Sequence, residues 1–199
     1  MTMPFSCRCG AVRGTLDPSD GVHLRCFCQS CRGAARLAGA ADPGADGVAL
    51  FQTTPDRLTF AAGRDLIEPL RFSPRSFVRR WRTRCCGDVL FSSGDSPRWP
   101  VAGPVDRVLA DPEALGPEQA RAFLPPRRAG GLRRHEGAGY LIAQFARRTA
   151  AARFRRAWRN DPLMEADGRY PKARPATPEE VSAAFPEGPP LPPYDAPPR

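Results

Sequence analysis

The stretch Arg25-Cys26-Phe27-Cys28-Gln29-Ser30-Cys31 decides how the fold of this chain is interpreted, because it holds three cysteines within six residues. The other four cysteines are also clustered, as Cys7-Arg8-Cys9 and as Cys85-Cys86, so none of the seven stands alone. Buried core cysteines would not bunch in this way. Thiolates are soft donors, which favour zinc or an iron–sulfur cluster over magnesium or calcium. The sequence therefore predicts a metal-binding domain.

Seven thiols divide into two metal sites if the distant groups meet in space. We expect one ion on Cys7, Cys9, Cys85 and Cys86, which would tie the N-terminal strand to a hairpin far along the chain. Structural zinc contributes about 10–16 kcal/mol to the folding of small peptides. Loss of this ion should unfold much of the N-terminal region.

The second expected site has only three thiols, those of Cys26, Cys28 and Cys31. Catalytic zinc sites keep one tetrahedral position for water or substrate, so these residues are the candidate catalytic group. A zinc ion there could stabilise a bound thiolate or hydroxide, or polarise a carbonyl. His23 lies three residues before Cys26 and could instead complete a closed structural site. His135, in a Gly- and Arg-rich connector, is interpreted as a solvated histidine.

Targeting segments bear on the state of these thiols. The first residues lack the apolar run of about 7–15 residues that a signal peptide needs, and no window reaches the roughly 18 apolar residues of a transmembrane helix. We therefore expect a cytoplasmic protein without membrane contact. Thiols stay reduced in the cytosol, which favours metal ligands over disulfides.

The net charge of +9 comes almost wholly from arginine, since Lys172 is the only lysine. A GC-rich genome explains this bias, because Ala, Gly and Pro are also abundant; an acidic ligand or nucleic acid would explain it too. Arg25, Arg32 and Arg84 lie beside cysteines and could hold the carboxylates of a small substrate. In the alternative they are ordinary exposed charges.

Short runs between turn residues predict a mainly β fold of mostly antiparallel strands. The expected strands cover residues 11–16, 48–52, 57–60, 66–72, 77–81 and 89–91. A short helix is expected over residues 29–37, with its first N–H groups directed toward the thiolates.

Three parts are expected along the chain. Residues 4–110 should form the zinc domain, and residues 111–170 a helical extension with helices over 112–123, capped by Asp111, and over 137–159. Residues 171–199 should form a proline-rich tail, disordered most clearly from Pro186 onward, because it lacks the apolar surface that offsets the entropy of ordering.

The motifs Cys7-x-Cys9-Gly10, Arg25-Cys26-Phe27-Cys28-x-x-Cys31 and Cys85-Cys86-Gly87 resemble the glutathione-dependent formaldehyde-activating enzyme family, which includes centromere protein V. The resemblance covers about residues 5–110. It implies an Mss4-like β-tent with zinc knuckles, a structural zinc on the first cysteine set and a more labile zinc on the second. It also implies carbon–sulfur lyase chemistry, in which formaldehyde and glutathione condense to S-hydroxymethylglutathione.

The last motif departs from the family pattern C-x-x-C-G. Here Thr83-Arg84-Cys85-Cys86-Gly87 is found, so Thr83 stands in place of a cysteine and Cys85 must substitute if Cys86 matches. Which of the adjacent cysteines binds metal, or whether both do, stays open. The C-C form and the stretch 158–168 resemble an uncharacterised bacterial branch of the family with a C-terminal extension.

Two functions follow from these observations. The first is a zinc-dependent lyase acting on glutathione or another thiol–aldehyde adduct at the three-cysteine site. The alternative is a non-catalytic zinc module whose arginine-rich helix, over 147–159 with Phe154 and Trp158, contacts nucleic acid or an acidic partner. That helix could equally pack its aromatic residues onto the β domain. An iron–sulfur cluster and a cysteine nucleophile are weaker alternatives, the second because no histidine is placed to serve as its base.

Overall fold

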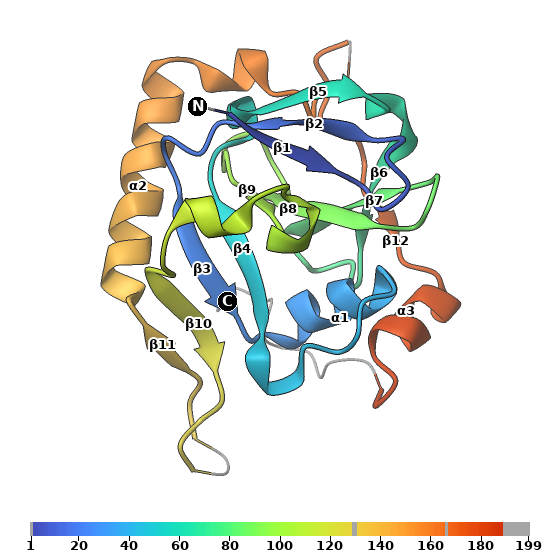
Figure 1. Ribbon diagram of the computed structural model, residues 1–199, viewed down its shortest axis with the longest axis vertical. Helices are drawn as coiled ribbons and strands as arrows, with labels where there is room; N and C mark the ends of the chain where they lie inside the picture. The colour runs from blue at the N-terminus through green and yellow to red at the C-terminus, as the bar shows by residue number, and fades with distance from the viewer. Residues whose placement is uncertain (1, 129–130, 166, 189–199) are drawn as a thin grey trace.

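A computed structural model describes residues 2–128, 131–165 and 167–188 of the chain, and it shows three β-sheets with helices packed around them (Figure 1). The strands are β1 (Met3–Ser6), β2 (Arg13–Leu16), β3 (Val22–Cys26), β4 (Val48–Gln52), β5 (Leu58–Ala62), β6 (Ile67–Arg71), β7 (Val78–Thr83), β8 (Val89–Gly94), β9 (Ala102–Pro104), β10 (Ala120–Leu124), β11 (Arg134–Glu136) and β12 (Arg174–Pro175). The α-helices are α1 (Gln29–Leu37), α2 (Ala138–Phe154) and α3 (Pro178–Ala184).

The sheets have the strand orders β1-β2-β5, β11-β10-β3-β4 and β12-β6-β7-β8-β9. Neighbouring strands run antiparallel except in the pairs β10–β3 and β12–β6, which are parallel. Single bridges pair Phe5 of β1 with Leu109, and Thr53, which follows β4, with Ala102 of β9. The prediction of a mainly β fold of short strands is confirmed.

The main core lies where the sheets meet, and it forms because alternate residues of each strand face inward. Trp81 on β7 and its cross-strand partner Phe91 on β8 are almost fully buried, with ring centroids 5.8 Å apart. Leu163, far along the chain, is also fully buried in this core. Strand β10 also pairs with β3 and extends its sheet. Segments after residue 110 therefore pack against the N-terminal strands and share their core.

Helix α1 begins where the sequence predicted it. Cys28 is its N-cap, and the Cys28 Sγ accepts a hydrogen bond from the backbone N–H of Cys31 at 3.3 Å. A thiolate at this place is stabilised by the unpaired N–H groups of the first turn and by the helix dipole. The N-terminus of α1 is therefore built to hold negative charge.

The expected helix over residues 112–123 is wrong. Pro112–Leu115 form one 3-10 turn that ends at Gly116, whose φ of +74° is a left-handed conformation. After Pro117, Ala120, Ala122 and Leu124 are buried in alternation, which is the period of a strand. The following helix is confirmed as α2, although its α-helical part ends at Phe154 and a 3-10 turn, Ala157–Asn160, follows.

The expected lack of structure in the tail is also wrong for the part that contains β12 and α3. Phe185 packs its ring edge-on against Phe72 at 5.0 Å, and Arg36 on α1 donates to the carbonyl of Ala184. These contacts place α3 beside α1, as Figure 1 shows at the lower right. Residues 189–199, to which most of the expected disorder refers, lie outside the described residues.

A capping box starts α3 and gives a first prediction. Thr177 Oγ1 accepts from the N–H of Glu180 at 3.2 Å, and Glu180 Oε2 accepts from the N–H of Thr177 at 2.9 Å. Thr177→Ala should cost about 1 kcal/mol and lower the melting temperature by about 2–4 °C, measured by circular dichroism. Thr177→Ser, which keeps the hydroxyl, is the control. An equal loss in both variants would contradict the role of this cap.

Candidate metal centres

The seven thiols gather into two groups, each of which could hold a metal ion. In each group all the sulfur atoms lie within 4.8 Å of one another. One group consists of Cys7, Cys9, Cys85 and Cys86, and the other of Cys26, Cys28 and Cys31. None of the seven forms a disulfide. The division that the sequence predicted is therefore the one that the fold brings about.

The four-cysteine cluster has the dimensions of a tetrahedral thiolate site. Its Sγ–Sγ distances include 3.5 Å for Cys7 and Cys9, 3.5 Å for Cys9 and Cys85, and 4.0 Å for Cys85 and Cys86. Zinc–sulfur bonds of 2.3 Å at tetrahedral angles would place sulfur atoms about 3.8 Å apart. Both adjacent cysteines thus reach the cluster.

Two tight turns present these thiols. After β1, the Gly10 N–H donates to the carbonyl of Cys7 at 2.9 Å, and the Val12 N–H points at Cys7 Sγ at 3.3 Å. After β7, the Gly87 N–H donates to the carbonyl of Thr83 at 3.0 Å. Gly10 and Gly87 both have positive φ angles, 76° and 73°, which few other residues tolerate. These are the two glycines that follow the cysteine motifs.

Thr83 explains why the last motif departs from C-x-x-C-G. Its side chain is fully buried, its Oγ1 accepts from the Asp88 N–H at 2.9 Å, and the same oxygen lies 3.4 Å from Cys86 Sγ. Thr83 therefore supports the turn without being a ligand, and Cys85 supplies the fourth sulfur from the exposed side.

The turn after β7 also lowers the pKa of one of these thiols, that of Cys86. Burial would raise the pKa of Cys86, but hydrogen bonds with Thr83 and with backbone N–H groups outweigh it and lower the pKa to about 6. Burial and the hydrogen bond with Cys9 raise the pKa of Cys85 to about 12. A lowered pKa favours the thiolate form, which is the form that binds metal.

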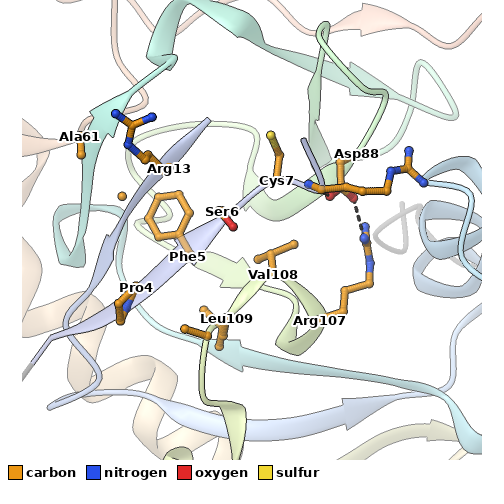
Figure 2. Close-up of a pocket in the computed structure, with 13 residues that line it drawn as sticks. Pro4, Phe5, Ser6, Cys7, Arg13, Ala61, Asp88, Arg107, Val108 and Leu109 are labelled. Carbon is orange, nitrogen blue, oxygen red and sulfur yellow. Dashed lines mark hydrogen bonds and ion pairs between the residues drawn. The ribbon is translucent and has the colours of Figure 1, made fainter. Parts of the chain in front are cut away.

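A surface cavity of about 560 Å³ lies beside this cluster, between β1 and the segment that contains Arg107. Asp88 is buried there, and its Oδ2 accepts the N–H of Arg8 at 3.0 Å. Figure 2 shows the ion pair between Asp88 and Arg107, 2.5 Å long. These charges are paired with each other and hold the cysteine turns together.

The three-cysteine cluster lies at the junction of β3 and α1. Cys26 and Cys31 are buried, Cys28 is half-buried, and the sulfur atoms of Cys26 and Cys28 are 3.3 Å apart. All three ligands come from one short stretch, so the end of the strand and the first turn of the helix build the site locally. No fourth Cys, His, Asp or Glu joins this group within the part of the chain that the structure describes.

Arg80 is the functional residue that the sequence analysis missed. It lies on β7, its side chain is buried, and both its terminal nitrogens lie 3.7 Å from Cys31 Sγ. Ser30 and Ser92 fix it by accepting hydrogen bonds at 2.7 and 2.5 Å. Ser92 is its cross-strand partner on β8. The available signal was Arg79-Arg80 within a strand, since arginine is rarely fully buried without a partner.

The charge of Arg80 matches the cluster. Three thiolates around a divalent cation leave one net negative charge, which a single buried guanidinium neutralises. Hydrogen bonds with Cys26 and Cys28, reinforced by Arg80, hold the pKa of Cys31 well below its usual value despite burial. The hydrogen bond with Cys26 lowers the pKa of Cys28, but the hydrogen bond with Cys31 and burial outweigh it and raise the pKa to about 12.

His23 does not belong to this cluster, so its suggested role as the fourth ligand is wrong. Its Nδ1 lies 2.7 Å from the carbonyl of Gly116, and its Nε2 lies 2.8 Å from Asp106 Oδ2. Both ring nitrogens are therefore occupied. Burial raises the pKa of Asp106, although the hydrogen bond with His23 acts against this shift. His135 is exposed, as expected.

The three arginines beside the cysteines have other partners. Arg25 forms a 2.5 Å ion pair with Glu118, and Arg32 donates two hydrogen bonds to Asp42 at 3.1 and 2.8 Å. Exposed Arg84 donates to the carbonyl of Asp65. The structure does not gather these three guanidinium groups around the three-cysteine cluster.

Three arginines of α2 and the turn after it also have side-chain partners. Arg147 contacts Asp20, Arg148 is buried and donates to Gln52 at 2.8 Å, and Arg155 donates to both oxygens of Asp56. These contacts fasten α2 to the β-sheets. Phe154 remains 96% exposed.

A second cavity, of about 210 Å³, borders the three-cysteine cluster. Cys31 and Arg80 lie in its wall together with residues of α1, β4 and β8. None of the residues of the four-cysteine cluster lines this second cavity. Each cluster therefore adjoins a cavity, the four-cysteine cluster through Cys7 and the three-cysteine cluster through Cys31.

Comparisons with known proteins name no activity. The model of a "Family of unknown function (DUF6151)" matches residues 1–131. A crystal structure of a Rhodobacter sphaeroides protein, a Northeast Structural Genomics target, matches with a TM-score of 0.41 and 19% identity, over 60% of this chain and 99% of that one. No curated protein matches. Among the described residues, no helix is both long and apolar enough to cross a membrane.

Proposed function

Because the chain belongs to the family of unknown function DUF6151, its role must be argued from the two cysteine clusters, and we propose that it is a two-zinc protein whose three-cysteine site binds a small thiol. The four-cysteine cluster would hold a structural zinc. The three-cysteine cluster would hold the zinc at which the thiol, or its adduct with an aldehyde, is bound and converted. One observation carries this proposal: Arg80 and a cavity, in place of a fourth ligand, border the three thiols.

The choice of zinc rests on the donors. Four thiolates in one cluster and three in the other, with Sγ–Sγ distances of 3.3–4.0 Å, suit a tetrahedral thiophilic ion. All seven thiols must be reduced to bind metal, so we also propose a reducing compartment, the cytoplasm. The resemblance of the cysteine motifs to those of the formaldehyde-activating enzymes supports an Mss4-like arrangement of the short strands.

The proposed reaction is the reversible condensation of a thiol with an aldehyde, a carbon–sulfur lyase activity in the direction of cleavage. The sulfur forms a bond to the carbonyl carbon, and the thiol proton moves to the carbonyl oxygen, so no oxidant or reductant is needed. When bound, zinc would supply stabilisation of the thiolate. Arg80 would keep the charge of the site balanced, and its hydrogen bonds to Ser30 and Ser92 would keep it in place.

The alternative of a nucleic-acid-binding module is less well supported by the geometry. A phosphate-binding surface needs guanidinium groups that are free to contact phosphates. On α2 and the turn after it, Arg147, Arg148 and Arg155 instead contact Asp20, Gln52 and Asp56.

Metal content tests the proposal. Native mass spectrometry should find two zinc ions per chain and one in Cys28→Ser, because Cys28 both ligates and caps α1. Gln29→Ala, at the exposed neighbouring position, is the control and should keep two. Addition of a thiol should give a bound adduct in the wild-type protein that is absent in Cys28→Ser. A single zinc in the wild-type protein, or visible absorption of an iron–sulfur cluster after anaerobic purification, would refute the proposal.

A further inference from the structure

The cavity beside Cys31 is small and enclosed by several elements. Helix α1, strands β4, β7 and β8, and the segment that contains Val105 and Asp106 all contribute to its wall. Its volume of about 210 Å³ is below the range of about 300–1,000 Å³ that is usual for sites of drug-sized ligands. A ligand that fits inside it must be small.

Most of the wall is apolar. Ala34 and Ala35 contribute from α1, and Val48, Ala49 and Leu50 from β4. Small side chains on both sides of the cavity leave the space open, and their methyl groups offer no hydrogen bonds. Burial of an apolar ligand surface here is favourable by about 25 cal/mol per Å².

Both arginines of the cavity wall already have partners, so neither is free to bind a ligand carboxylate. Arg80 is held by Ser30 and Ser92 and faces Cys31. Arg107, the other arginine of the wall, is paired with Asp88 and donates to the carbonyl of Val89. An anionic group placed in this cavity would therefore have to break an existing ion pair, at the cost of leaving a buried charge unpaired.

Asp106 adds a hydrogen-bond acceptor to the same wall. Its Oδ2 is held by His23, whereas its Oδ1 is buried and has no hydrogen-bond partner among the residues that the structure describes. A buried oxygen of this kind is costly unless a donor reaches it. A ligand carboxylate placed in this cavity would be repelled by the Asp106 carboxylate.

We propose that this cavity binds the organic part of a small, uncharged apolar thiol, or of the hemithioacetal that it forms with an aldehyde, and excludes glutathione. This inference rests on the proposed function of the three-cysteine site and adds its substrate class. The apolar chain occupies the alanine-lined space, and the sulfur lies toward Cys31 and the metal. Glutathione, which carries two carboxylates, finds no free arginine in this wall.

Binding to the cobalt-substituted full-length protein tests this inference without an activity assay. Cobalt replaces zinc in thiolate sites, and its absorption bands report a thiol that enters its coordination shell. We expect butane-1-thiol to shift these bands with a dissociation constant at least about tenfold lower than that of glutathione.

Ala49→Phe should fill the cavity and weaken butane-1-thiol binding about tenfold or more, with two metal ions still bound. Ala61→Phe, an exposed position on β5 that does not line this cavity, is the matched control and should bind as the wild type does. If Ala49→Phe does not fold, Ala35→Leu on α1 narrows the same space.

The outcomes separate the two proposals. Glutathione binding as tightly as butane-1-thiol, or equal butane-1-thiol binding in Ala49→Phe and the wild-type protein, would overturn the substrate class and leave the thiol site standing. No spectral change with either thiol, in protein that carries two cobalt ions, would overturn the proposed function itself.

Discussion

Cys9→Ser is expected to remove most of the stability of the chain, although Cys9 is exposed and has little packing to lose. Its sulfur lies 3.5 Å from those of Cys7 and Cys85, which belong to turns 78 residues apart in the sequence. A structural zinc contributes about 10–16 kcal/mol in small peptides, whereas whole domains are stable by about 5–15 kcal/mol. The loss of one ligand should therefore unfold β1 and the turn between β7 and β8.

The measurement is urea denaturation followed by circular dichroism, with zinc content determined on the same samples. Ser6→Ala, an exposed neighbour on β1 that is not a ligand, is the control and should melt with the wild type. A strong chelator should bring the wild-type protein to the stability of Cys9→Ser and leave the variant unchanged. If Cys9→Ser were as stable as the wild-type protein, and the chelator changed the stability of neither, no metal would hold this cluster.

Arg80→Leu is the second variant with a large expected effect, and the sign of that effect is diagnostic. If the three-cysteine cluster holds a divalent metal, loss of the guanidinium leaves one buried negative charge uncompensated, at a cost of about 3–5 kcal/mol. If the thiols were neutral and metal-free, a buried arginine would be the uncompensated charge, and leucine would stabilise the fold. The structure favours the first case, because Arg80 faces Cys31 at 3.7 Å.

Chemical denaturation gives the change in stability, and competition with a coloured chelator gives the change in zinc affinity. Arg84→Leu is the matched control, since Arg84 adjoins Cys85 in sequence but is exposed, and its side chain donates to the carbonyl of Asp65. Arg80→Lys should retain part of the affinity, because it keeps the charge but loses the forked geometry that reaches both Ser30 and Ser92. Greater stability of Arg80→Leu in the presence of zinc would contradict the charge balance.

Local patterns in the sequence predicted those parts of the molecule that local interactions determine. The spacing from Cys26 to Cys31 predicted both a ligand set and helix α1, because the N-cap thiol and the first turn are neighbours in sequence. Strand β4 was predicted with its observed bounds. The grouping of Cys7 with Cys85 and Cys86 followed from counting thiols, since three remain for the other site.

The features that the sequence did not predict depend on contacts between segments that are distant in the chain. The strand β10 pairs in parallel with β3, almost 100 residues away in sequence, and no local pattern reveals such a partner. His23 was considered as a ligand because it precedes Cys26, but Asp106 and the carbonyl of Gly116, both distant in sequence, occupy its ring. Arg80 was missed because the burial of a strand arginine becomes visible only when α1 packs over β7 and β8.

The difference between a local and a distant ligand set has a consequence for how the chain acquires its metals during synthesis. Cys86 follows Cys31 by 55 residues, so at about 5–20 residues per second several seconds pass on the ribosome before the four-cysteine cluster can form. The three other thiols are already made throughout that interval, but Arg80, which faces Cys31, follows them only after 49 residues. The complete three-cysteine site, with its arginine, therefore forms only shortly before the four-cysteine cluster.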